Sequence, residues 1–424
     1  MLYDVILFDL DGTLTESAPG ITRSARFAVE QMGYTGFDPQ VFETFIGPPL
    51  YGSFREHFGM DDGEAEEAVR RYRAHYAERG LFECAVYRGI PSLLRRLRAG
   101  GARLFVATAK PQVFAERILR RFGLAHFFEG VAGATLDERG ADKAPLIRAA
   151  LPAGAGRAVM IGDRRYDVEG GQANGIDTVG VCYGYGSRAE LAEAGSTYIV
   201  DTVAELGDLL APGMPPPPGF FVTVEGLDGS GKTTQIDRLA AHLRQLGYDT
   251  LRTREPGGNP IAEKIRELVL SPDNLGMHAW TEALLYAAAR AEHVHAVVRP
   301  ALAGGQVVLC DRYVDSSAVY QGMGRELGLE RVLEVNGLAT GGLQPDLTLY
   351  LRLDAAKALA RRGRASSLDR IEMEQGAFHR RVCDAYDQLA ARYPERIRVV
   401  DASLPVEEIA AAACAEMDGL LAER

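Results

Sequence analysis

Gly226-Leu227-Asp228-Gly229-Ser230-Gly231-Lys232-Thr233 is the stretch that decides the fold of the second half of the chain. It follows the apolar, strand-like run 220–224 and precedes a helical pattern that begins at Thr234. Glycines at these spacings allow backbone amides to wrap around phosphate oxygens. A strand, a glycine-rich loop and a helix in this order predict a parallel α/β sheet that grips the phosphates of a nucleotide.

A second signature lies near the N-terminus, where the apolar run 5–8 is followed by Asp9-Leu10-Asp11-Gly12-Thr13. Carboxylates at the C-terminal edge of a parallel sheet enter the crevice where such sheets bind ligands. One carboxylate can then attack phosphorus while the other exchanges a proton. Further polar residues stand at the ends of later strands or at the start of a helix, in an order that lets them converge: Thr108, Lys143, Asp163 and Asp167.

The proline run 215–218 marks the clearest boundary in the chain. Consecutive prolines continue neither a helix nor a central strand, and they form a short, fairly stiff spacer. We therefore expect two domains, 1–211 and 220–424, joined by a linker over 212–219. In both domains strand-like runs alternate with helical patterns, which predicts α/β folds with parallel sheets covered by helices. Residues from about 15 to 85 show helical patterns and no convincing strand, so a helical insertion is expected there.

Composition excludes several classes of protein. The 424 residues, 47% hydrophobic and 25% charged, suit two globular domains. The net charge of −11 argues against a general nucleic-acid-binding surface, which needs a basic excess. The five cysteines form no Cys-x-x-Cys pair and so indicate neither a zinc site nor a disulfide framework. No apolar stretch approaches the roughly 20 residues that span a bilayer, so we expect a cytoplasmic enzyme without a membrane partner.

Over residues 3–210 the motifs around Asp9, Thr108, Lys143 and Asp163 resemble, in order, those of the haloacid dehalogenase-like phosphatases. The resemblance implies a Rossmann-like domain in which Asp9 is the nucleophile that forms an aspartyl-phosphate. It also implies that Asp11 protonates the leaving oxygen and later activates water, and that Thr108 and Lys143 hold the transferring phosphoryl oxygens. Mg²⁺ would bind Asp9, Asp163 and the backbone carbonyl of Asp11, with Asp167 in support. A carboxylate that attacks a phosphate dianion needs such cations to reduce repulsion.

The helical insertion is similar to a cap that sets substrate choice in this family. Three segments resemble the phosphoglycolate phosphatase and 5'-nucleotidase-like branch: 45–50, 107–111 and 183–187. Ala109 departs from the Asn or Ser more usual in that branch, so the substrate stays open between phosphoglycolate, a non-standard nucleotide and another small phosphate ester. The basic cap residues Arg70, Arg71, Arg73 and Arg79 are interpreted as a solvated helix face.

The second half, from 220 to about 420, resembles the thymidylate kinase family, a group of P-loop nucleoside monophosphate kinases. Three motifs carry the resemblance: Thr253-Arg254-Glu255-Pro256-Gly257-Gly258, Asp311-Arg312-Tyr313-Val314-Asp315-Ser316-Ser317 and Leu368-Asp369-Arg370-Ile371-Glu372. The resemblance implies phosphoryl transfer from ATP to dTMP, which gives ADP and dTDP. The ATP phosphates would lie on Gly226, Leu227, Asp228, Gly229, Ser230, Gly231, Lys232, Thr233 and Thr234, with Lys232 at the β- and γ-phosphates.

The same resemblance implies an acceptor site. Tyr286 occupies the position of the ring that stacks on thymine, and Arg290 shares its helix face one turn later. The residues expected to bind dTMP are Asp228, Arg254, Tyr286, Arg290, Arg312, Ser317 and Gln321. Thr233 and Asp311 would lie near a second Mg²⁺.

Catalytic arginines are expected in a lid. Phosphoryl transfer between two polyanions needs cations as charge moves, and the glycine-rich loop has no arginine of its own. We therefore expect Arg364 and Arg370 to act in catalysis, while Arg361 and Arg362 are interpreted as a solvated basic face.

Taken together, the two signatures predict a bifunctional enzyme, a Mg²⁺-dependent phosphatase joined to a dTMP kinase. The halves would oppose each other if the phosphatase accepted dTMP, so a different phosphate ester is favoured as its substrate. Two alternatives stay open: the phosphatase-like domain could regulate or scaffold the kinase, or the glycine-rich loop could drive a switch or motor. The resemblance also implies a homodimer formed through the kinase domain.

Overall fold

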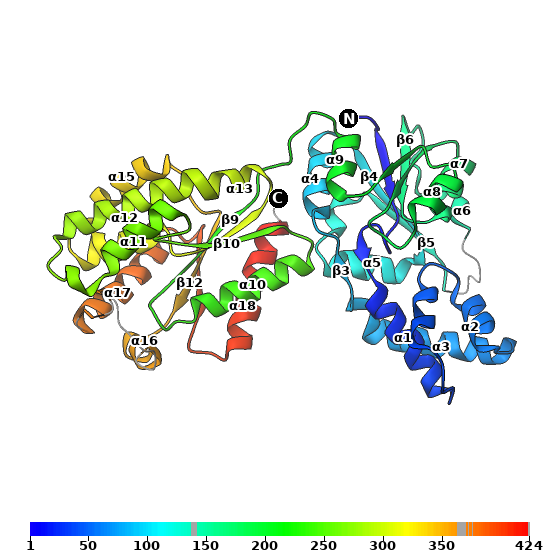
Figure 1. Cartoon of the computed structure of the whole chain (residues 1–424), viewed down its shortest axis with the longest axis horizontal. Coiled ribbons are helices and arrows are strands. Elements are labelled where there is room, and N and C mark those ends of the chain that lie inside the picture. The colour runs from blue at the N-terminus through cyan, green and yellow to red at the C-terminus, as the bar shows by residue number, and fades with distance from the viewer. Residues whose placement is uncertain (137–141, 363–369, 372, 375, 423–424) are drawn as a thin grey trace. The chain divides into compact units, whose positions relative to one another are not determined.

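Parallel pairing of central strands organises both halves of the chain (Figure 1). The structure is a computed structural model, and it describes residues 1–424 except 137–141, 363–369, 372, 375 and 423–424. The described chain divides into two compact units, Met1–Pro216 with Arg244–Tyr248 and Pro217–Leu243 with Asp249–Arg424. Each unit holds one main sheet, as the alternating pattern predicted.

The first unit contains a six-stranded parallel sheet in the order β5-β4-β1-β6-β7-β8. Its strands are β1 (Val5–Phe8), β4 (Arg103–Pro111), β5 (Gly130–Ala134), β6 (Ala158–Gly162), β7 (Asp177–Val181) and β8 (Tyr198–Val200). Phe8 of β1 lies beside Val106 of β4 and Ile161 of β6. This register brings the residues that follow the three strands to one edge of the sheet.

Helices pack around this sheet: α4 (Ile90–Ala99), α5 (Gln112–Arg121), η3 (Ala125–Phe127), α6 (Lys143–Ala150), α7 (Arg165–Ala173), α8 (Arg188–Glu193) and α9 (Val203–Leu210). The core on one face joins Ile147 of α6 to Val5, Leu7 and Met160, all fully buried or nearly so. Burial of such side chains supplies the main stabilisation of the sheet.

The expected insertion is present as a helical cap. It consists of α1 (Ala18–Gln31), η1 (Pro39–Phe45), α2 (Leu50–Phe58), α3 (Asp62–Glu78) and η2 (Gly80–Phe82). A short antiparallel pair, β2 (Thr15–Glu16) and β3 (Ala85–Val86), closes its base. The sequence did not reveal this pair, because two residues are too short to show the period of a strand.

The second unit contains a five-stranded parallel sheet in the order β10-β11-β9-β12-β13. Its strands are β9 (Phe221–Glu225), β10 (Thr250–Arg254), β11 (Val307–Asp311), β12 (Leu347–Arg352) and β13 (Ile397–Asp401). Val224 at the centre lies beside Asp311 of β11 and Leu349 of β12. The glycine-rich loop therefore leaves the sheet next to Asp311.

Helical segments surround this second sheet. They are α10 (Lys232–Gln245), α11 (Pro260–Leu270), η4 (Pro272–Asn274), α12 (Ala279–His293), η5 (Val294–Val298), α13 (Arg299–Ala303), α14 (Val314–Ser317), η6 (Ala318–Gly324), α15 (Leu329–Thr340), α16 (Ala355–Arg362), α17 (Gly376–Arg392) and α18 (Val406–Ala422). In the part of the chain that the structure describes, no helix has both the length and the apolar character to cross a membrane.

Candidate active sites

A cluster of carboxylates forms the floor of the first site. Asp9 follows β1, Asp163 follows β6 and Asp167 lies in the first turn of α7, and one oxygen of each lies within 4.8 Å of the others. Lys143 at the start of α6 forms ion pairs with Asp9, at 2.6 Å from Nζ to Oδ2, and with Asp167. Gly12 is required beside them, because a Cβ there would lie 2.2 Å from Asp163 Oδ2. The sequence placed all four charged residues together, and the structure does the same.

Burial and mutual repulsion shape the charges of this cluster. Burial first, and then Asp167 and Asp9, raise the pKa of Asp163 to about 8. Burial opposes the charge of Lys143, but Asp167 and Asp9 outweigh it and raise the pKa of the lysine. Asp9 Oδ1 is buried without a hydrogen-bond partner among the described residues. Carboxylate oxygens are the ligands that Mg²⁺ prefers, so the cluster fits this cation.

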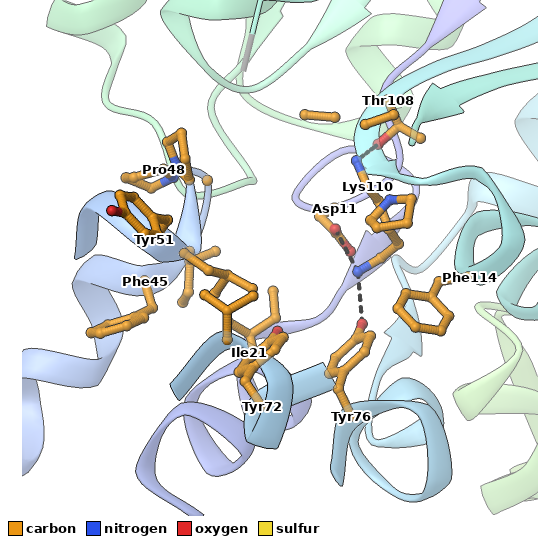
Figure 2. A pocket seen from close by; sticks show the side chains of 18 of the residues that line it. Asp11, Ile21, Phe45, Pro48, Tyr51, Tyr72, Tyr76, Thr108, Lys110 and Phe114 are labelled. Atoms are coloured by element: carbon orange, nitrogen blue, oxygen red, sulfur yellow. Dashed lines mark hydrogen bonds and ion pairs between the residues drawn. The ribbon is translucent and has the colours of Figure 1, made fainter. Parts of the chain in front are cut away.

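The second carboxylate of the first motif has a different partner. Asp11 Oδ2 lies 2.8 Å from Nζ of Lys110, and the same ammonium donates to the hydroxyl of Tyr76 in α3 at 2.7 Å (Figure 2). Thr108, two residues before Lys110 on β4, is buried and accepts a hydrogen bond from the Lys110 amide at 3.3 Å. Lys110 was not among the predicted site residues, although its spacing of two from Thr108 puts both side chains on the same side of an extended strand.

A cavity of about 480 Å³ connects these groups to the cap. The cap contributes Phe45, Tyr51, Tyr72 and Tyr76 on one side, and Asp11 and Lys110 face them from the sheet (Figure 2). Arg70 and Arg73 also line the cavity. Arg70 is nevertheless exposed and pairs with Glu67, as expected of a solvated face, whereas Arg73 is half-buried. Helical periodicity alone did not show which face of α3 looks toward the sheet.

Tyr185, in the loop after β7, links the cluster to the cap. Its backbone amide donates to Asp163 Oδ2 at 2.8 Å, and its hydroxyl oxygen accepts the amides of Ser17 and Ala18 at 2.6 and 2.8 Å. Arg164 makes a second link, because its guanidinium donates to the carbonyl of Ile46 at 3.1 Å. The sequence assigned neither residue to the site.

The glycine-rich loop forms the centre of the second site. Lys232 Nζ donates to the carbonyl oxygens of Gly226 and Leu227 at 3.2 and 3.1 Å. Gly226 has φ +138°, and a Cβ there would lie 2.7 Å from the carbonyl oxygen of Leu351. Ser230 Oγ and Asp311 Oδ1 are buried without a hydrogen-bond partner within the described chain, so they fit a phosphate and its cation. Thr233 and Thr234 are exposed in the first turn of α10.

A pocket of about 90 Å³ opens beside this loop. Six of the seven residues predicted to bind dTMP line it: Asp228, Tyr286, Arg290, Arg312, Ser317 and Gln321. The seventh, Arg254, is exposed and pairs with Glu263 at 2.9 Å. Further lining residues that the sequence did not assign are Glu255, Pro256, Arg266, Leu270, Ser316, Tyr320 and Ile371. Four of these, Glu255, Pro256, Ser316 and Ile371, stand inside the three motifs that carry the resemblance and were the easiest to find from the sequence.

Two ion pairs set the charges of this pocket; Arg290 and Glu255 are buried, whereas Arg312 and Asp228 are partly exposed. Arg312 donates to Asp228 Oδ1 at 2.7 Å, and Arg290 donates to Glu255 Oε2 at 2.6 Å. Burial alone would raise the pKa of Asp228, but Arg312 and Lys232 outweigh it and lower the pKa. Arg290 also donates to Ser317 Oγ and to the carbonyl of Tyr313, both at 3.0 Å. It therefore holds the wall of the pocket together.

The arginines predicted to lie in the lid differ in their surroundings. Arg364 lies outside the described residues. Arg370 is buried, its guanidinium lies 2.6 Å from Glu282 Oε2, and its Nε donates to the carbonyl of Val269 at 2.9 Å. These partners belong to α12 and α11, whereas a catalytic role needs a guanidinium directed at the transferring phosphoryl group. Arg361 of α16 donates to the carbonyl of Ala402 at 3.0 Å.

Comparisons with known proteins assign both halves. The family models for thymidylate kinase and for haloacid dehalogenase-like hydrolases match residues 224–413 and 6–181. The thymidylate kinase of Lactobacillus delbrueckii subsp. bulgaricus is 49% identical over 197 residues, which cover 46% of this chain and 93% of that protein. That of Pseudomonas putida strain W619 is 49% identical over 202 residues, covering 48% and 98%.

Among solved structures, a predicted phosphatase from Clostridium acetobutylicum is 42% identical, with a TM-score of 0.47, and covers 50% of this chain and 99% of that chain. The two family models match separate halves of the chain. The chain therefore belongs to the thymidylate kinase family through its second half and carries a haloacid dehalogenase-like hydrolase domain in its first half.

Proposed function

We propose that the second unit transfers the γ-phosphoryl group of ATP to dTMP and that the first hydrolyses a small phosphate ester through an aspartyl-phosphate on Asp9. The observation that carries the kinase is the pocket that gathers six predicted acceptor residues beside the glycine-rich loop. The observation that carries the phosphatase is Asp9, paired with Lys143 and left with one buried, unpartnered oxygen.

In the kinase reaction the acceptor phosphate attacks the γ-phosphorus of ATP, and ADP leaves. Arg312 stands beside Asp228 at the junction of loop and pocket, where the two phosphates would meet. Lys232 is held by two carbonyl oxygens and by Asp228 Oδ1 at 3.4 Å, so its ammonium would exchange these partners for phosphate oxygens when ATP binds. Mg²⁺ at Asp311 and Thr233 would offset charge on the phosphates.

In the phosphatase reaction an oxygen of Asp9 attacks phosphorus, and Asp11 gives its proton to the leaving oxygen. Asp11 then takes a proton from the water that cleaves the aspartyl-phosphate. Lys143 and Thr108 would stabilise the transferring phosphoryl oxygens. Mg²⁺ on Asp9, Asp163 and the carbonyl of Asp11, with Asp167 in support, would reduce repulsion between nucleophile and phosphate.

A reciprocal pair of variants tests both assignments in the full chain. Lys232→Ala should lower dTMP-dependent ADP formation by at least roughly 100-fold and leave phosphate-ester hydrolysis unchanged. Asp9→Asn should abolish hydrolysis and spare the kinase, because the amide is a poor nucleophile. If Asp9→Asn hydrolysed the ester at the wild-type rate, Asp9 would not be the nucleophile. A chain with no hydrolysis at all would favour a regulatory or scaffold role for the first unit.

We also propose that the chain forms a homodimer through α11, α12 and α15. The exposed apolar side chains Ile261, Leu284 and Leu338 lie on these helices, and Leu338 is 83% exposed. α12 packs against both α11 and α15, and exposed apolar side chains on neighbouring helices are typical of protein contacts. Analytical ultracentrifugation should show a dimer in the wild type and a monomer in Leu338→Asp, and a monomeric wild type would refute the proposal.

A further inference from the structure

Glu282 on α12 is a buried carboxylate that was not among the predicted site residues. Only 1% of it is exposed. It accepts a hydrogen bond from Gln321 Nε2 at 2.8 Å and forms ion pairs with Arg325 at 3.2 Å and Arg370 at 2.6 Å. A buried charge with two guanidinium partners and one amide partner is costly to build, so its placement behind the acceptor pocket calls for a function.

The contact between Glu282 and Gln321 fixes the orientation of the Gln321 amide. A carboxylate between two guanidinium groups only accepts hydrogen bonds, whereas an amide has a donor end and an acceptor end. Gln321 must therefore turn its NH₂ group to Glu282. The carbonyl oxygen of this amide then points away from Glu282, on a side chain that lines the acceptor pocket. The reverse orientation would bring two acceptor oxygens together.

The orientation of this amide determines which base it can recognise. Thymine and uracil carry a hydrogen-bond donor at N3, and cytosine carries an acceptor there. A fixed carbonyl pairs with the first kind of ring and repels the second. We propose that Glu282 sets the base selectivity of the acceptor site by holding the carbonyl oxygen of Gln321 toward the pyrimidine. This inference rests on the proposed kinase function and names Glu282 as a positioning residue, because it acts through Gln321.

The test compares kcat/KM for dTMP and for dCMP in the full chain. Glu282→Gln keeps the size of the side chain but supplies an NH₂ group that can donate to Gln321, so the Gln321 amide can rotate. The ratio of the two kcat/KM values should fall by at least roughly 10-fold. Arg325→Met is the matched control, since it removes a partner of Glu282 and leaves the hydrogen bond to Gln321 in place. Its ratio should stay within about threefold of the wild type.

A second variant keeps the test decisive if Glu282→Gln does not fold, which a thermal melt would show. Gln321→Met removes the carbonyl itself and should lower the same ratio by a similar factor. A ratio that stays at the wild-type level in the folded Glu282→Gln or in Gln321→Met would overturn the inference. A wild type that does not phosphorylate dTMP would instead refute the kinase assignment, so the two failures are distinguishable.

Discussion

The two sites balance charge in different ways. In the first, each carboxylate of the Asp9 motif has its own lysine, Lys143 for Asp9 and Lys110 for Asp11. In the second, Asp228 and Glu255 of the smaller pocket pair with arginines, while Lys232 is held mainly by backbone carbonyls. A lysine is a compact cation that can move to a new partner, whereas an arginine fixes geometry through several donors. The first site thus places compact, buried ammonium groups beside its carboxylates, and the second builds the wall of its pocket from arginines.

The largest expected effect comes from removing the lysine of the carboxylate cluster. Lys143→Met leaves Asp9, Asp163 and Asp167 without their shared cation, so attack on a phosphate dianion should slow by roughly 1,000-fold in kcat. Hydrolysis of a general phosphate ester measures the loss. ADP formation with dTMP in the same preparation is the control and should not change. A loss of both activities would show that the two sites are not independent.

Two variants separate the contacts that Lys110 makes with Asp11 and with Tyr76, and both are expected to have smaller effects. Lys110→Met removes the partner of Asp11 and the bond to the cap, and should lower kcat/KM for hydrolysis by roughly 10- to 100-fold. Tyr76→Phe removes only the bond to the cap and should cost a few-fold, about the value of one hydrogen bond. Steady-state kinetics of both variants give the comparison. Equal losses would place the role of Lys110 in holding the cap, not in serving Asp11.

The smallest effect concerns Glu225, the last residue of β9. Burial first, and then Asp315, raise its pKa from 4.5 to about 7. Between these values the folded protein keeps a proton that the unfolded chain has lost, so this carboxyl contributes less to stability as pH rises. Glu225→Gln has no such proton to lose. The free energy of unfolding of the variant should therefore improve relative to the wild type between about pH 5 and pH 8.

Fluorescence of Trp280, the single tryptophan, reports the unfolding of the second unit in both proteins. The difference between the two proteins removes the contributions of other titrating groups. If the difference in unfolding free energy between Glu225→Gln and the wild type were the same at about pH 5 and about pH 8, the proton on Glu225 would not be linked to folding.

Residues at strand ends were predictable from the sequence, and contacts between helices were not. Asp9, Asp163 and the glycine-rich loop follow apolar runs, and parallel pairing brings such positions to one edge regardless of the helices. Gln321 and Glu282 are 39 residues apart, and Lys110 and Tyr76 are 34 apart. Such pairs depend on which face of a helix turns inward, and that is decided by packing. Arg370 was predicted to act in catalysis because it lies in an arginine-rich stretch. That pattern does not show that its guanidinium pairs with the buried carboxylate of Glu282.

The hydrogen bonds of Tyr185 hold the base of the cap to the sheet domain. Because one residue binds Asp163 through its amide and the amides of Ser17 and Ala18 through its hydroxyl, the first turn of α1 is tied to the carboxylate cluster. A swing of the whole cap about its base would break both hydroxyl contacts at once. The start of α1 therefore stays in place unless these hydrogen bonds break.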